Sequence, residues 1–150
     1  MSKELNLSKK IIGTYRLISY EARDQEGNVT YPMGKDCTGF IMYLPEGHMS
    51  VHMMAQGRPK YASGELHNGT KEEMASAAHG YLAYAGPYEV DEEKQMLIHH
   101  MSVSLNPTWL GESQKRPILI EGNRVTITGQ PIIDNGVQKF TTLVWERVEK

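Results

Sequence analysis

The sequence predicts an all-β fold, an antiparallel β-barrel of about eight strands with one short helix. Three observations support this prediction. Most of the chain consists of short segments in which apolar and polar residues alternate with a period of two, as in half-buried strands. Turn-forming residues separate these segments, and two of the turns, Pro45-Glu46-Gly47 and Glu121-Gly122-Asn123, are of the hairpin type. Only one segment has the signals of a helix, so most of the core must come from the sheet, as it does in a closed barrel.

The predicted elements follow the chain in order. Alternating strands are expected over residues 14–23, 38–44, 48–54, 95–105, 115–120, 124–128 and 138–148. In the first hairpin turn, Pro45 presets the first position and Gly47 can take the left-handed conformation. A capping box formed by Thr70 and Glu73 starts the helix, which is predicted over residues 71–82 and ends before Gly86-Pro87. Small and apolar residues follow the box at helical spacing: Met74, Ala77, Ala78 and Tyr81.

Length and composition indicate one globular domain. The chain has 150 residues, 39% apolar and 23% charged, and we expect a single domain over 1–150 with 1–11 as an N-terminal tail or short helix. Its 16 basic and 18 acidic residues give a net charge of -2, which disfavours nucleic-acid binding through a basic face. There is no apolar run of membrane-helix length and no signal peptide. The single cysteine, Cys37, cannot form an internal disulfide, so we expect a cytoplasmic protein without nucleic-acid or membrane partners.

The first hairpin separates the inner face of the barrel from the outer face. If Leu44 pairs with His48 across the turn, alternation produces one face that is apolar throughout, and this face is predicted to point inward. It contains Gly39, Ile41, Tyr43, Met49, Val51 and Met53. The histidines His48 and His52 then point outward.

The same alternation places polar side chains on an apolar inner wall. In the strand over 95–105 the more apolar face holds Leu97, His99, Met101, Val103 and Leu105, which leaves His100 outside. In the next strand the inward set is Gln114, Arg116, Ile118 and Ile120. A further segment places Tyr84, Gly86, Tyr88 and Val90 on one face. His99, Arg116 and Gln114 are thus predicted to lie close together in the interior, with Tyr84 or Tyr88 within reach.

Each of these polar residues has two interpretations. His99 is either a hydrogen-bonded core histidine or a ligand contact or acid/base group, whose pKa burial and a neighbouring arginine would lower. Arg116 either reaches solvent at the end of the barrel or needs an acidic partner or an anionic ligand. Tyr84 and Tyr88 suit a pocket wall as well as simple packing. Trp109 either caps the barrel mouth or anchors its loop.

No metal, cofactor or nucleophile site is predicted. On a strand, His48 and His52 would lie roughly 13 Å apart, and His99 and His100 point to opposite faces, so neither pair can chelate one ion. The chain contains neither a Gly-x-Ser-x-Gly elbow nor a Gly-rich phosphate loop. Cys37 has no nearby base in the sequence and is expected to be inert.

An ordered set of motifs resembles a known family. The stretch Gly13-Thr-Tyr15 resembles the Gly-x-Trp strand start of lipocalins. Later stretches are similar to the lipocalin-like domain family of bacteria and fungi, over about residues 12–148: Tyr31-Pro-Met-Gly34, Pro45-Glu-Gly-His-Met-Ser-Val51, Gly57-Arg-Pro59, Gly80-Tyr-Leu-Ala-Tyr84, Tyr88-Glu-Val-Asp91, His99-His100, Asn106-Pro-Thr-Trp-Leu-Gly111 and Leu143-Val-Trp-Glu-Arg147. The resemblance implies a small lipocalin-type barrel and no particular reaction. It also implies a closure in which Arg147 covers residue 15, which is Tyr in this chain.

These residues lead to hypotheses from different classes. The first is a module that binds a small, largely apolar molecule with a polar or anionic end in the barrel. Its expected contacts are Arg116, Gln114, Tyr84, Tyr15, Met101, Tyr43 and Trp109. The alternative is a cofactor-free isomerase, cyclase or lyase in which His99 or Tyr88 is the acid/base and Arg116 stabilises an oxyanion. A third hypothesis is a structural barrel that acts through protein contacts. Ligand identity, the open end of the barrel and a homo-oligomeric state are left open.

Overall fold

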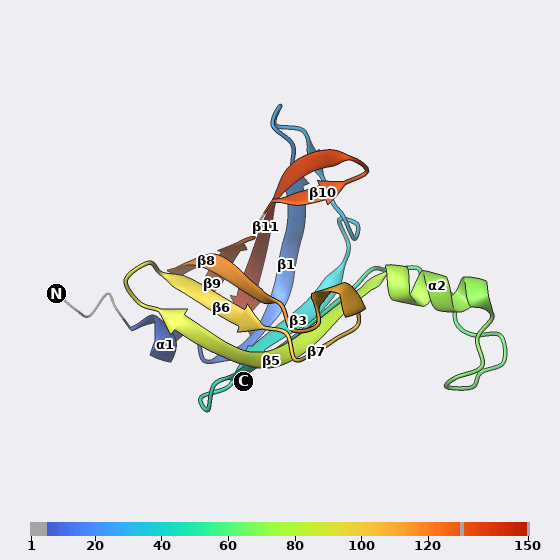
Figure 1. Ribbon diagram of the computed structural model, residues 1–150, viewed down its shortest axis with the longest axis horizontal. Coiled ribbons are helices and arrows are strands. Elements are labelled where there is room, and N and C mark those ends of the chain that lie inside the picture. Colours follow the sequence, from blue (N-terminus) through green and yellow to red (C-terminus); the bar gives the residue numbers. More distant parts are fainter. Residues whose placement is uncertain (1–5, 130, 150) are drawn as a thin grey trace.

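Residues 6–129 and 131–149, which the computed structural model describes, form a closed antiparallel β-barrel, as the sequence predicts (Figure 1). Eight strands make the barrel, each hydrogen-bonded to the next in the order β1 (Gly13–Arg23), β3 (Thr38–Tyr43), β4 (His48–Met54), β5 (Tyr81–Asp91), β6 (Met96–His100), β8 (Ser113–Glu121), β9 (Arg124–Thr128) and β11 (Val137–Arg147). Pairing of β11 with β1 closes the ring. Three short strands, β2 (Val29–Thr30), β7 (Val103–Ser104) and β10 (Ile132–Asp134), pair with β1, β5 and β11.

The first hairpin has the predicted register and faces. The Leu44 N–H donates to the His48 carbonyl at 2.9 Å, and the two strands pair from there to Thr38 and Met54. The side chains of Ile41, Tyr43, Met49, Val51 and Met53 are buried in the core. His48 and His52 are exposed on the outer face, as expected.

The predicted strand over 95–105 is wrong beyond His100. β6 ends there, and β7 resumes the pairing one residue out of register, because Tyr88 pairs with His99 but Tyr84 pairs with Ser104. The extra residue reverses the faces that follow. Val103 and Leu105, predicted to point inward, are therefore 62% and 45% exposed.

Gly86 is the reason that the chain can bulge at this place. A Cβ atom at Gly86 would lie 2.0 Å from the His100 carbonyl oxygen and 2.9 Å from the Ser102 nitrogen. Only glycine lets the two backbones approach this closely. The Ser102 N–H then donates to the Ala85 carbonyl at 3.0 Å, which starts the shifted register.

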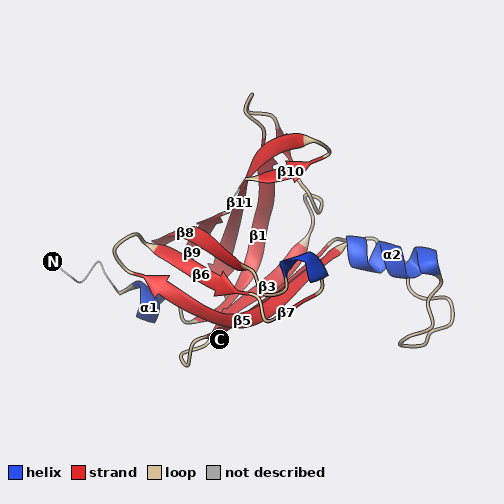
Figure 2. Cartoon of the chain, in the orientation of Figure 1, coloured by secondary structure: helices blue, strands red, loops and turns tan. Residues whose placement is uncertain are grey.

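The helix α2 (Lys71–His79) begins where it was predicted and ends earlier. The capping box is present, with Glu73 N–H donating to Thr70 Oγ1 at 3.1 Å and Thr70 N–H donating to Glu73 Oε1 at 2.9 Å. Gly80 caps its C-terminus and Tyr81 already starts β5, so Gly86-Pro87 lie inside a strand instead of after the helix. α2 has no buried residue and lies beside the barrel with the preceding loop (Figure 2). No helix in the described part of the chain is both long and apolar enough to cross a membrane.

One end of the barrel is closed by α1 (Leu7–Lys10) and Arg147. The Arg147 guanidinium lies 4.8 Å from the centre of the Tyr15 ring. It donates to the carbonyls of Ile12 and Lys10 and to the Tyr15 hydroxyl, at 2.8, 2.7 and 2.7 Å. The closure implied by the resemblance is therefore formed with Tyr in place of Trp.

Candidate functional site

The barrel encloses a cavity of about 420 Å³ in the half away from the Tyr15–Arg147 closure. Most of its wall is apolar, with aliphatic side chains from β3, β4, β9 and β11: Ile41, Val51, Met53, Ile127 and Leu143. A smaller polar set lines it together with the two indole rings: His99, Gln114, Arg116, Thr141, Trp109 and Trp145. An apolar wall with a few polar groups is typical of a small-molecule site.

The structure brings together five of the residues predicted for the site. His99 on β6 and Arg116 and Gln114 on β8 line the cavity from neighbouring strands, as predicted, and Tyr84 and Trp109 complete this group.

Four other candidates do not line the cavity. Tyr15 lies at the closed end with Arg147. Its prediction as a ligand contact is wrong because no sequence signal identifies which end of the barrel is open. Met101 is buried at the bulge that follows β6. Tyr88 donates its hydroxyl hydrogen to the Leu44 carbonyl at 3.0 Å and packs edge-on against Tyr43, with ring centres 5.0 Å apart. Tyr43 reaches the site only through His99.

Sequence reasoning missed three polar or aromatic lining residues, Tyr20, Thr141 and Trp145. Thr141 and Trp145 share the inward face of β11 with Leu143, so the alternation over 138–148 contained the signal for both. Tyr20 had no such signal. A bulge in β1 between Leu17 and Ser19 changes the inward face, which brings Tyr20 to the cavity wall.

His99 is held between two tyrosine hydroxyls. Tyr43 Oη lies 2.8 Å from Nε2, and Tyr84 Oη lies 2.9 Å from Nδ1. The imidazole is 1% exposed, and its burial, with the charges of Arg116 and His100, lowers its pKa well below the ordinary value. Burial raises the pKa of both tyrosines, so all three groups are neutral near pH 7.

Arg116 carries a positive charge at the cavity wall. Its Nη1 donates to Gln114 Oε1 at 2.9 Å. No ion pair to Arg116 is formed by a carboxylate among the side chains that the structure describes, which leave out Asp134. Its Nε is buried, as is Trp145 Nε1, and neither atom has a hydrogen-bond partner in that same part of the chain. The site therefore contains two donors that the described protein groups leave unsatisfied.

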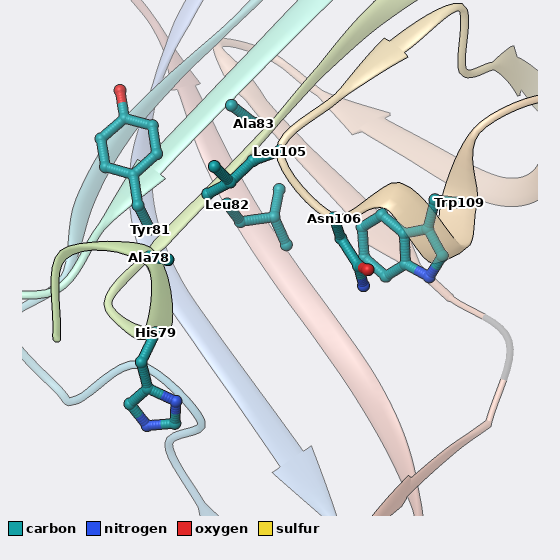
Figure 3. Close-up of a pocket in the computed structure, with 8 residues that line it drawn as sticks. All are labelled: Ala78, His79, Tyr81, Leu82, Ala83, Leu105, Asn106 and Trp109. Carbon is teal, nitrogen blue, oxygen red and sulfur yellow. The ribbon is translucent and has the colours of Figure 1, made fainter. Parts of the chain in front are cut away.

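An outer pocket of about 390 Å³ adjoins the cavity at the start of β5 (Figure 3). The C-terminus of α2 and the turn at η2 (Pro107–Trp109) form its other walls. Leu82 and Trp109 line both spaces and therefore lie between them. The Trp109 ring packs edge-on against Tyr84, with ring centres 5.8 Å apart. Trp109 and Leu82 thus separate the cavity from the outer pocket.

The outward histidines form ordinary surface contacts. His100 bonds Ser113 Oγ at 2.7 Å and Glu89 Oε2 at 2.5 Å. Among the described residues, no three His, Cys, Asp or Glu side chains are grouped closely enough to hold a metal ion.

His99 makes the free energy of unfolding depend on pH. Because its folded-state pKa lies well below the value of about 6.5 expected in the unfolded chain, only the unfolded state takes up this proton on mild acidification. The contribution of His99 to the free energy of unfolding is therefore complete above about pH 6.5. Below this pH, the free energy of unfolding falls by about 1.4 kcal/mol per pH unit until the folded-state pKa of His99 is reached. Urea denaturation between about pH 7 and pH 5 measures this slope.

The matched control is an exposed histidine. His99→Gln is expected to remove the slope, and His52→Gln controls for the loss of an imidazole at an exposed position. A wild-type stability that is flat over this pH range contradicts the prediction.

Comparison with known proteins agrees with the geometry. The lipocalin-like domain family matches residues 12–148, which include all eight barrel strands. A 4'-hydroxy-3'-methoxypropiophenone carrier protein of Aspergillus oryzae is 30% identical over 109 residues, which cover 68% of this chain and 98% of that protein. The fold, the Arg147 closure and the match over nearly the whole chain lead to one conclusion: the chain belongs to the lipocalin-like domain family.

Proposed function

We propose that the protein binds and carries a small, largely apolar molecule whose polar or anionic end lies against Arg116 and Trp145. One observation carries the proposal: Arg116 Nε and Trp145 Nε1 are buried at a mostly apolar wall, without a hydrogen-bond partner in the described chain. Leaving a buried donor unsatisfied costs about 1–3 kcal/mol. A ligand oxygen placed at this wall would remove that cost.

The polar side chains that line the cavity favour ligands with hydrogen-bond acceptor atoms. Arg116 and Trp145 only donate, and the Gln114 carbonyl oxygen is already occupied by Arg116, which leaves the Gln114 amide N–H groups. No carboxylate lines the cavity in the part of the chain that the structure describes. The favoured ligand therefore bears a phenolic, carbonyl or carboxylate oxygen on an apolar body. The fungal relative supports this class, because the compound in its name is a phenolic aryl ketone.

The geometry favours carriage over acid/base chemistry. Both ring nitrogens of His99 are occupied by tyrosine hydroxyls, so neither faces a ligand directly. Tyr88, the other candidate acid/base, uses its hydroxyl on the Leu44 carbonyl and lies outside the cavity lining. We therefore prefer a binder to an isomerase, cyclase or lyase.

Isothermal titration with 4'-hydroxy-3'-methoxypropiophenone tests the proposal, and we expect saturable binding of about one molecule per chain. Trp145→Phe keeps the packing of an aromatic ring but removes the N–H. It should weaken binding by roughly three- to tenfold. Without ligand, the substitution should not cost the protein the stability of a hydrogen bond, because the wild-type indole N–H has no partner in the described chain.

Val144→Ala, on the neighbouring β11 position outside the cavity lining, is the matched control and should keep the wild-type affinity. The proposal fails if the compound does not bind in a saturable way.

A further inference from the structure

We propose that Tyr43, His99 and Tyr84 form a hydrogen-bonded chain of fixed direction that points the Tyr84 hydroxyl hydrogen into the cavity, where it binds a second acceptor oxygen of the ligand. This inference rests on the proposed function of the cavity and narrows its ligand class. It concerns three residues from three strands, β3, β6 and β5, which meet at His99.

The number of donor hydrogens in this cluster exceeds the number of hydrogen bonds at His99. A neutral imidazole has one N–H donor and one acceptor nitrogen, and each tyrosine hydroxyl has one hydrogen. The cluster therefore has three donor hydrogens, but the two contacts at His99 use only two of them. One tyrosine accepts from the imidazole N–H, and its own hydroxyl hydrogen must find another acceptor.

The surroundings of the two tyrosines decide which one keeps the spare hydrogen. Tyr43 is 1% exposed, does not line the cavity, and its hydroxyl bonds only His99 in the described chain. A spare hydrogen there would be buried without an acceptor, which is unfavourable. Tyr84 and His99 both line the cavity, so a spare hydrogen on Tyr84 can reach a ligand or water.

The favoured arrangement thus has one direction. The Tyr43 hydroxyl donates to His99 Nε2, His99 Nδ1–H donates to Tyr84 Oη, and the Tyr84 O–H points to the cavity. Arg116, which also lines the cavity, opposes protonation of the imidazole and so preserves this neutral chain. Tyr43 acts as a positioning residue, since it reaches the cavity only through His99.

The ligand class follows from the two donor sets. Arg116 and Trp145 line the cavity with buried donors that have no partner among the described residues, and Tyr84 adds a hydroxyl hydrogen. A molecule that satisfies both carries two acceptor oxygens on one apolar skeleton, such as a phenol with a ketone. We assign the phenolic oxygen to Arg116, because a cation favours the more acidic oxygen, and the carbonyl to Tyr84.

Nitrogen NMR of the unliganded protein tests the direction of the chain. In wild-type protein labelled with ¹⁵N, His99 is expected to show a protonated, pyrrole-like Nδ1 and an unprotonated, pyridine-like Nε2. The opposite tautomer overturns the inference. Packing alone does not distinguish the tautomers, so this readout is specific to the proposed direction.

A pair of ligands tests the second acceptor. The probes are 4'-hydroxy-3'-methoxypropiophenone and 2-methoxy-4-propylphenol, the same skeleton with CH₂ in place of the carbonyl. Wild-type protein should bind the ketone roughly three- to tenfold more tightly. Tyr84→Phe should abolish this preference and leave the affinity for the propylphenol nearly unchanged. Tyr31→Phe, which removes the hydroxyl of a tyrosine that does not line the cavity, should keep the preference.

The outcomes separate the two proposals. A ketone preference that survives Tyr84→Phe overturns the inference, while binding of both compounds still supports the carrier function. If neither compound binds, the carrier function and the ligand class are both contradicted, although the tautomer of His99 is still measured independently.

Discussion

Arg116→Ala is expected to weaken binding of the phenolic ketone by about 1.5–3 kcal/mol, or roughly ten- to 150-fold in Kd. The substitution removes the only cation among the described residues that line the cavity, and with it a buried Nε that has no protein partner there. A charge-assisted hydrogen bond to a ligand oxygen is lost without replacement. Isothermal titration of the variant and the wild type measures the change.

The control for Arg116 is its neighbour on the same strand. Lys115 is an exposed cation, and Lys115→Ala should leave Kd unchanged. The unliganded Arg116→Ala variant should fold normally, because Arg116 bonds Gln114 and no described carboxylate is left unpaired. An unchanged Kd in Arg116→Ala would remove the main support for an anionic or phenolic ligand.

Arg147→Ala should lower the free energy of unfolding by about 3 kcal/mol, the largest stability effect that we expect from a single polar side chain. The guanidinium donates to two carbonyls and one hydroxyl and covers the Tyr15 ring. These contacts join β11 to the segment before β1 and so close one end of the barrel. Hydrogen bonds to a charged group contribute about 1.5–3 kcal/mol each but do not add fully. Urea denaturation at neutral pH measures the loss.

Arg16→Ala is the comparison for Arg147. Arg16 also lies on the strands that close the barrel, where it forms an ion pair with Glu146, but its side chain is 56% exposed. Its loss should cost less than about 1 kcal/mol. Equal effects of the two substitutions would show that the closure contributes no more than a surface ion pair.

The parts of the fold that could be predicted from the sequence are those where strict alternation persists. The Pro45–Gly47 turn sets the register of β3 and β4, so the apolar face of that hairpin could point only inward. The inward placement of His99 and Arg116 is correct for the same reason. In the predicted strand over 95–105, the bulge begins only after His100.

The errors have a common cause in bulges and helix ends. Val103 and Leu105 are apolar, so the sequence continues to alternate where the chain has already shifted by one residue. The bulge in β1 hid Tyr20 in the same way. The predicted helix continues to residue 82 because Tyr81 fits a helical period as well as a strand period, and only pairing with β4 decides between them.

The position of Trp109 bears on the rate at which a bound ligand would leave the cavity. Arg116 and Trp145 belong to strands, where the hydrogen-bond ladder fixes them, but Trp109 belongs to a three-residue turn held by a bond from Thr108 N–H to Asn106 Oδ1 at 3.0 Å. A change in that turn would alter the boundary between the cavity and the outer pocket, where Leu82 and Trp109 line both spaces. For the proposed carrier function, we expect substitution of Trp109 to change the residence time of the ligand as well as its affinity, because Trp109 also lines the cavity.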